Sequence, residues 1–130
     1  MMQIEKTPLQ QERLEIYTLG RFLVKRDNKV ISECWRTSKP WLLFKYFLTH
    51  RGKNILPESA LENLWPQQQY TDPRRAFRSL VFRLRNLLSP NCSSFFDSYI
   101  SFSHGCYHWN TELDYWFDAE EFEHLCQKAH

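Results

Sequence analysis

Five arginines lie within one short stretch of the sequence, TDPRRAFRSLVFRLRNLL, which runs from Thr71 to Leu88. A guanidinium group stays charged at any physiological pH and presents a fork of N–H donors that matches phosphate oxygens and the edges of bases. The chemistry that this stretch can carry is therefore the binding of a polyanion. It needs an element that brings the arginines to one surface.

That element is predicted to be a helix over residues 73–88. Asp72 can cap the first backbone amides, and Pro73 stands at the first helical position, where its missing N–H costs nothing. The cluster Ser89-Pro90-Asn91 then stops the helix. Apolar residues recur at the i, i+3, i+4, i+7 spacing of a stripe that docks on a core. They are Phe77, Leu80, Val81, Leu84, Leu87 and Leu88.

The opposite face of this helix, found by stepping about 100° per residue from Phe77, has no acidic residue. An ordinary solvated face mixes charges and gains from ion pairs, whereas a face of one sign repels itself until an anion arrives. A plain arginine-rich solvent face is the alternative. The face holds Arg75, Arg78, Ser79, Phe82, Arg83 and Asn86, with Arg74 and Arg85 at its edge.

Phe82 is the apolar member of this face, and the sequence leaves its environment open. The ring can point outward and meet a binding partner. Alternatively, the loop before the helix or a later hairpin can fold over the ring and bury it.

The length and composition of the chain exclude disorder and a membrane span. The chain has 130 residues, of which 42% are hydrophobic and 16% aromatic, so it is long enough for a core and is not disordered. Its longest apolar run, residues 41–48, is interrupted by Lys45 and is far shorter than the ~20 residues of a membrane span. The N-terminus has no apolar segment typical of a secretory signal. We therefore expect a cytoplasmic protein without membrane association.

The net charge of +2 conceals two oppositely charged parts. Residues 1–110 hold 16 Lys and Arg against 9 Asp and Glu, whereas residues 111–130 hold one lysine against 6 acids. A polyanion is the natural partner of the basic part, and a protein neighbour that of the acidic part.

No metal, cofactor or catalytic site is expected. The four cysteines, Cys34, Cys92, Cys106 and Cys126, include no Cys-x-x-Cys pair. His104, Cys106 and His108 invite a metal site, but a hairpin places His104 at its tip and leaves two ligands where three or four are needed. No carboxylate pair, nucleophile with a base, or glycine-rich phosphate loop points to an enzyme.

The other elements predict an α+β fold. Alternating residues from Leu14 to Lys25 and the pair Val30-Ile31 predict a small N-terminal antiparallel sheet. Helices are expected at 41–50, with Leu43, Phe44, Phe47 and Leu48 on one face, and at about 57–65, burying Ala60, Leu61 and Leu64. With the arginine helix they make a three-helix bundle. A short acidic helix is expected within LDYWFDAEEFEHLC near the C-terminus.

Between the arginine helix and the acidic segment, SYISFSHGCYHWN predicts a β-hairpin. His104-Gly105 suits a type I′ turn, in which both residues take positive φ. Pairing outward from this turn puts Ile100, Phe102, Tyr107 and Trp109 on a packing face and Ser101, Ser103, Cys106 and His108 on a wet face.

This order of elements, and the residues within them, resemble the OmpR/PhoB-type winged helix-turn-helix DNA-binding domain. More closely, they resemble the branch of bacterial antibiotic-regulatory (SARP, AfsR-like) transcriptional activators. The matching segments are IYTLGRFLV, SKPWLLFKYFLTHRGK, LPESALENLWP, FRSLVFRLRNLL, GCYHWN and, for the start of a bacterial transcriptional activation domain, LDYWFDAEEFEHL. The chain differs from the family in having Pro57 where a Ser or Thr cap is usual and His108 where the wing usually has arginine.

The resemblance implies a polar lead at 1–12, a winged helix DNA-binding domain at 13–110 and the beginning of a helical second domain at 111–130. Helix 73–88 is then the recognition helix in the major groove, and the wing 98–109 lies near the adjacent minor groove or backbone. Arginine can read guanine, and an aromatic ring can meet a thymine methyl group. Base reading is expected from Arg75, Arg78, Ser79, Phe82 and Arg83, and backbone or wing contacts from Arg74, Arg85, Asn86, His104 and His108.

By the same resemblance, RNA polymerase is an expected partner, and two protomers are expected to bind in tandem on duplex DNA. The alternative function is a winged-helix interaction module that docks an acidic protein. Protein interfaces prefer one or two arginine anchors to a continuous basic face, which disfavours this alternative. Double-stranded RNA is disfavoured because its deep, narrow major groove excludes a helix.

Overall fold

The computed structural model describes residues 13–33, 35–89 and 99–128. The predicted lead 1–12, Cys34, Cys92, the stop residues Pro90 and Asn91, and residue 98 at the start of the predicted wing lie outside these ranges. The described residues form two compact units. One is Glu33–Leu113, and the other combines the residues up to Ser32 with those from Asp114 onward.

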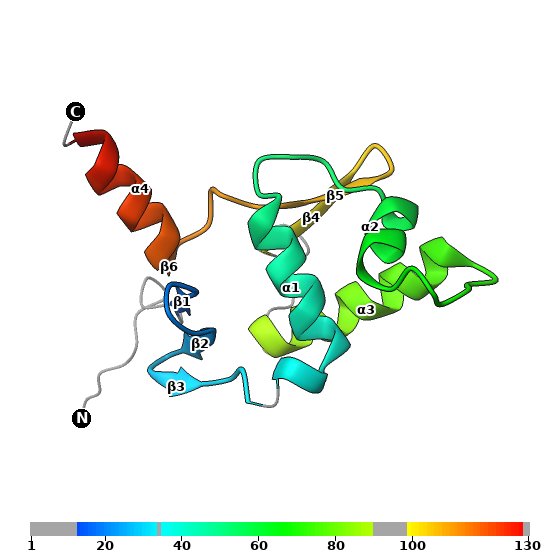
Figure 1. Cartoon of the computed structure of the whole chain (residues 1–130), viewed down its shortest axis with the longest axis horizontal. Coiled ribbons are helices and arrows are strands. Elements are labelled where there is room, and N and C mark those ends of the chain that lie inside the picture. Colours follow the sequence, from blue (N-terminus) through cyan, green and yellow to red (C-terminus); the bar gives the residue numbers. More distant parts are fainter. Residues whose placement is uncertain (1–12, 34, 90–98, 129–130) are drawn as a thin grey trace, which may run out of the picture. The chain divides into compact units, whose positions relative to one another are not determined.

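The Glu33–Leu113 unit is built on three α-helices (Figure 1). Ser38 caps the first helix by accepting a hydrogen bond from the Trp41 amide, and Asp72 caps the third by accepting one from the Arg75 amide. The second helix starts at Pro57 without a side-chain cap, where a proline needs no partner for its nitrogen. The elements are the 3₁₀ turn η1 (Trp35–Thr37), α1 (Lys39–Thr49), α2 (Pro57–Leu64) and α3 (Pro73–Leu88).

The predicted apolar faces of the helices form the core of this unit. All four predicted residues of α1 are buried, and so are Ala60 and Leu61 of α2, while Leu64 is half-buried. On α3 the predicted stripe is buried except for Leu87, which is half-buried. Phe77 lies at the centre, with its ring centroid 6.2 Å from that of Phe47 on α1 and 5.0 Å from that of Tyr107.

A β-hairpin completes the unit, and its predicted turn and register are confirmed. β4 (Ile100–Ser103) pairs with β5 (Cys106–Trp109) so that Ile100 faces Trp109 and Phe102 faces Tyr107. His104 and Gly105 have φ of 55° and 79°, as a type I′ turn requires. The Ile55 backbone bonds to that of Tyr107 in both directions, at 2.7 and 2.9 Å, and so ties the hairpin to the segment before α2.

The second unit is a four-stranded sheet with one helix. β1 (Leu14–Tyr17) pairs antiparallel with β2 (Leu23–Arg26), and β2 with β3 (Lys29–Val30). Asp27 and Asn28 make the turn between β2 and β3 with φ of 55° and 66°, a conformation that Asp and Asn tolerate better than most residues. The predicted N-terminal antiparallel strands are therefore present.

The acidic segment differs from the prediction in its first part. Residues 115–117, expected within a helix, form β6 (Tyr115–Phe117), which pairs parallel with β1 and makes the sheet mixed, in the order β3-β2-β1-β6. Side chains alternate across a strand, so Phe117 is buried while Trp116 lies against Tyr17, with ring centroids 5.1 Å apart. Only α4 (Asp118–Lys128) is helical.

The pairing of β6 with β1 groups the residues from Asp114 onward with the N-terminal strands. The domain boundary at residue 111 stays a prediction. That the segment begins a further helical domain stays a prediction. None of the described helices combines the length and the apolar composition that a membrane span requires.

Asp118 fixes the start of α4 to the end of β1. Its carboxylate accepts hydrogen bonds from the Thr18 and Leu19 amides, each at 3.0 Å, and from the Thr18 hydroxyl at 3.2 Å. We expect Asp118→Ala to speed amide hydrogen exchange at Thr18 and Leu19 about tenfold, because charged hydrogen bonds contribute more than neutral ones. Glu121→Ala removes an exposed acid of the same helix and is the control. Equal exchange in both variants would contradict this role.

Candidate nucleic-acid interface

The face of α3 opposite the core is open to solvent, as predicted. All six residues assigned to it are exposed, and Arg74 at its edge is exposed too. Every exposed charged side chain of α3 is an arginine. The apolar stripe explains this arrangement, because Phe77, Leu80 and the other buried residues turn one side of the helix to the core and so leave the opposite side in solvent. The members are Arg75, Arg78, Ser79, Phe82, Arg83 and Asn86, which we call the outer face.

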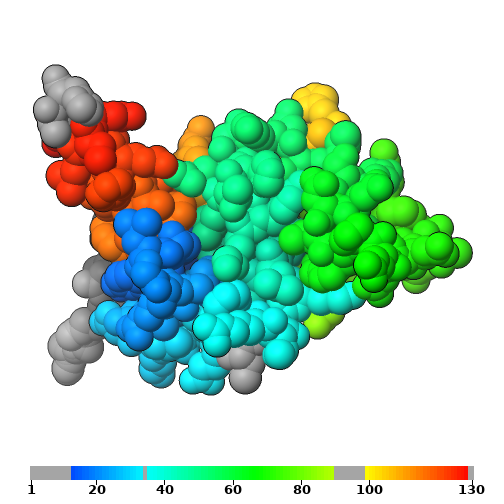
Figure 2. Space-filling view, viewed as in Figure 1, coloured from blue at the N-terminus to red at the C-terminus, as the bar shows by residue number. Residues whose placement is uncertain are grey.

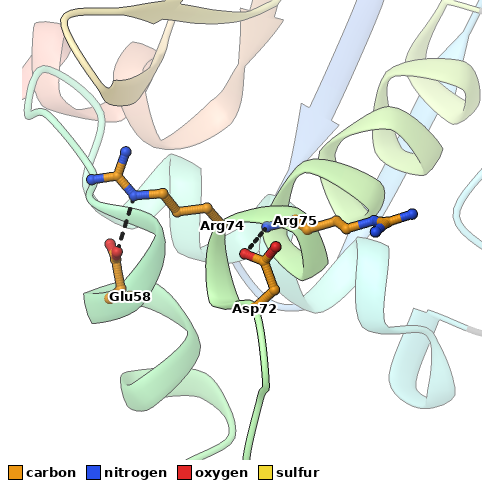
Figure 3. A network of polar contacts seen from close by, with 4 residues as sticks. All are labelled: Glu58, Asp72, Arg74 and Arg75. Atoms are coloured by element: carbon orange, nitrogen blue, oxygen red, sulfur yellow. Dashed lines mark hydrogen bonds and ion pairs between the residues drawn. The ribbon is translucent and has the colours of Figure 1, made fainter.

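Arg74 has an acidic partner that the sequence did not reveal. Its Nε donates a hydrogen bond of 3.1 Å to Oε2 of Glu58, in the first turn of α2 (Figure 3). The neighbouring Arg75 extends its guanidinium to the other side, away from Glu58 (Figure 3). The two adjacent arginines therefore have different neighbours, and their separate roles stay a prediction.

The Arg74–Glu58 ion pair is solvated, with more than half of the Arg74 side chain exposed. The Glu58 backbone amide at the start of α2, and next the Arg74 guanidinium, lower the pKa of the Glu58 carboxyl. A lowered pKa in the folded state means that the contribution of the carboxylate is present above its unfolded pKa and is lost as pH falls through the folded value. The pair is thus intact at neutral pH.

Arg85 is placed differently from the prediction. It is half-buried, and one of its terminal nitrogens donates a hydrogen bond of 2.7 Å to the backbone carbonyl oxygen of Ile100 at the start of β4. This bond joins α3 to the hairpin. A guanidinium used in this way has less freedom to follow a phosphate, and we assign Arg85 to holding the hairpin.

The environment of Phe82, which the sequence left open, is an exposed one. Its side chain is 62% exposed, whereas Phe77 on the same helix is completely buried. The two rings occupy opposite sides of α3, five positions apart in the sequence. The interpretation that Phe82 joins the core is therefore wrong.

The hairpin offers polar rather than basic groups. His104 is exposed at the turn, which protrudes from the surface of the helical unit at the top of the view (Figure 2). His108 lies in β5 opposite Ser101, is half-buried, and has no hydrogen-bond partner for Nδ1 among the described residues. His104 can reach a ligand without rearrangement, and His108 is less accessible.

Phe102 was expected on the packing face and is instead 55% exposed. Its ring lies 4.7 Å from that of Tyr107, centroid to centroid, while Ile100, Tyr107 and Trp109 on the same face are buried. Phe102 lies on β4, whereas Tyr107 opposite it on β5 is joined to Ile55 and is buried. Alternation predicts which side of a strand a residue faces, but not how far the core extends along it.

Sequence reasoning also missed two lysines of α1 that lie over tryptophan rings. Lys39 Nζ is 4.9 Å from the centroid of the Trp65 ring. It also donates a hydrogen bond of 2.8 Å to Oε1 of Gln68. Lys45 Nζ is 4.3 Å from the centroid of Trp35. Cation–π contacts of this kind hold ammonium groups in place at a surface. The partners are distant in sequence or on another element, so no spacing indicated them.

Within the described parts of the chain, no group of three or more His, Cys, Asp or Glu side chains is placed to hold a metal ion. Cys106 and Cys126 are free thiols, the first half-buried and the second exposed.

No protein-family model matches the sequence, and no curated protein matches it. Among solved structures, the fold is similar to that of EmbR from Mycobacterium tuberculosis, determined in complex with a low-affinity phosphopeptide. The TM-score is 0.60 at 16% identity, over 77% of this chain and 26% of the EmbR chain. The chain thus spans about a quarter of the length of EmbR, and at this identity the likeness is one of fold.

Proposed function

We propose that this chain binds duplex DNA sequence-specifically and activates transcription, as a winged helix-turn-helix protein of the OmpR/PhoB type. In this proposal α2 and α3 are the helix-turn-helix, α3 enters the major groove, and the β4–β5 hairpin is the wing near the adjacent minor groove or backbone. The observation that carries the proposal is the outer face of α3, whose exposed charges are all arginines.

The fold supports the same assignment. The three helices followed by a hairpin stand in the order that the OmpR/PhoB-type resemblance implies, and the likeness to EmbR covers 77% of the chain. Arg75, Arg78, Ser79, Phe82 and Arg83 are proposed to meet base edges. Arg74, Asn86, His104 and His108 are proposed to lie near the backbone, with Arg85 positioning the wing.

The alternative, docking of an acidic protein, uses the same face. The observation against it is that four arginines and no acid are exposed along α3, whereas the centre of a protein interface is depleted of charged residues. Phe82 is its single large apolar group. A repeating array of phosphates neutralises such a face better than scattered carboxylates do.

Mobility-shift titrations with duplex DNA, and with single-stranded DNA and duplex RNA as competitors, test the proposal. Duplex DNA should bind best, and selection from a random duplex library should yield a preferred site. If about five phosphates are neutralised per protomer, the plot of log K against log[salt] has a slope of about −4.5. A slope shallower than about −2, or equal competition by RNA, would contradict the proposal.

The ion pair between Arg74 and Glu58 gives a second test. Glu58→Gln removes the partner of Arg74 and should free its guanidinium for a phosphate, steepening the salt slope by up to about 0.9 and raising affinity on any duplex sequence. Glu62→Gln removes the same charge from α2 without freeing Arg74 and is the control. Stability should hardly change, because the pair is solvated. An unchanged slope and affinity would mean that Glu58 does not compete with phosphate for Arg74.

We further propose that the chain acts without a catalytic site or cofactor, in the cytoplasm, and that two protomers bind in tandem. α4 fits the role of a protein contact, with RNA polymerase the partner that the resemblance suggests. It has no buried residue, exposes Phe122 and Leu125, and carries four acids.

A further inference from the structure

Phe82 is the one apolar residue of the outer face. Single exposed apolar residues are common on protein surfaces and by themselves mean little. This ring, however, is 62% exposed at the middle of a face that is otherwise arginine, serine and asparagine. It is the only large exposed apolar side chain of α3, all of whose residues are described.

The neighbours of Phe82 on the helix surface follow from the helical repeat. Arg78 and Ser79 lie one turn before it and Asn86 one turn after it. One helical turn advances about 5.4 Å, and one base pair about 3.4 Å. Side chains one turn apart on a helix in the major groove therefore meet base pairs that are one or two steps apart.

The major-groove edges of the four base pairs carry hydrogen-bonding groups and one apolar group, the C5 methyl of thymine. A phenyl ring has no hydrogen bond to offer and is complementary to that methyl alone. The guanidinium of Arg78 is complementary to guanine O6 and N7. The Phe82 ring and the Arg78 guanidinium are thus suited to contact different, neighbouring bases.

Resting on the proposed function, we propose that Phe82 makes α3 a reader of the pyrimidine C5 methyl group, one or two base pairs from a guanine read by Arg78. The contact senses the methyl and no other part of the base. Uracil in place of thymine should therefore weaken binding at that position, and 5-methylcytosine should bind better there than cytosine.

The experiment is a uracil scan of the duplex that library selection yields, in which each thymine is replaced in turn. Wild type should lose about fourfold in affinity at one position, the factor that corresponds to ~0.8 kcal/mol for one buried carbon group. Phe82→Ala should bind the thymine and uracil duplexes equally. Phe82→Leu should keep part of the discrimination, because leucine is also apolar.

Phe122→Ala is the matched control, since Phe122 is similarly exposed and belongs to α4, which is not among the proposed DNA-binding elements. It should keep the full preference for thymine. Thermal melting should give nearly the same midpoint for wild type and Phe82→Ala, because truncating an exposed ring leaves no cavity.

The outcomes separate the inference from the function on which it rests. Absence of duplex binding by wild type would overturn both. Sequence-specific binding with a flat uracil scan, or a thymine preference that persists in Phe82→Ala, would overturn the methyl contact and leave the function standing. An equal loss by Phe82→Ala on selected and random duplexes would identify the ring as a sequence-independent contact and would also overturn the inference.

Discussion

Phe77→Ala is expected to lower the free energy of unfolding of the helical unit by roughly 3–5 kcal/mol, the range for deleting a buried phenylalanine ring. Phe77 is fully buried and packs between Phe47 of α1 and Tyr107 of β5. Its loss leaves a cavity where α1, α3 and the hairpin meet. Denaturant unfolding followed by circular dichroism measures the change, with the slope against denaturant expected to stay constant.

Phe82→Ala is the control for this prediction, because it makes the same substitution on the opposite side of the same helix. Its ring is 62% exposed, so the change in stability should be less than about 1 kcal/mol. A similar loss of stability in both variants would mean that Phe82 is covered in solution, and it would remove Phe82 from the outer face.

Arg78→Ala is expected to weaken binding to the selected duplex by roughly 1–3 kcal/mol and to change binding to random duplex little. Arg78 is exposed in the N-terminal half of α3, the part of a recognition helix that meets base edges. A bidentate contact to guanine is lost on the preferred site alone, so specificity falls with affinity. Parallel titrations of the selected and the random duplex by fluorescence anisotropy measure the affinity for each, and their ratio gives the specificity.

Arg74→Ala should behave differently, since Arg74 lies at the edge of the outer face and is held by Glu58. It should weaken both duplexes to a similar and smaller extent, as the loss of a phosphate contact does. If both variants lost affinity equally on both duplexes, the division of α3 into base-reading and backbone residues would be incorrect.

The local elements were predictable because short-range chemistry specifies them. The Asp72 cap with Pro73 set the start of α3, and the helix indeed runs Pro73–Leu88. His104-Gly105 set a two-residue turn, and that turn fixed the register of the hairpin. In each case residues adjacent in the chain decide the conformation, so the sequence carries the information directly.

The strand β6 was not predictable in this way. Residues 115–117 follow an aromatic pattern that suits a strand or a helix, and the pairing with β1, about 100 positions earlier, selects the strand. The same holds for the bond from Arg85 to Ile100 and for the ion pair of Arg74 with Glu58. These partners are set by how helices and strands pack, which no local spacing reports.

The sequence by itself determined that one helix would carry an apolar stripe opposite a basic face, because the helical repeat sorts residues by position. It did not determine which of those arginines are free, nor whether Phe82 lies in the core or in solvent. Only the tertiary structure decided these points, since burial and pairing depend on what covers a surface. α2 supplies Glu58 to Arg74 and β4 supplies a carbonyl to Arg85, whereas Phe82 keeps an exposed ring among arginines.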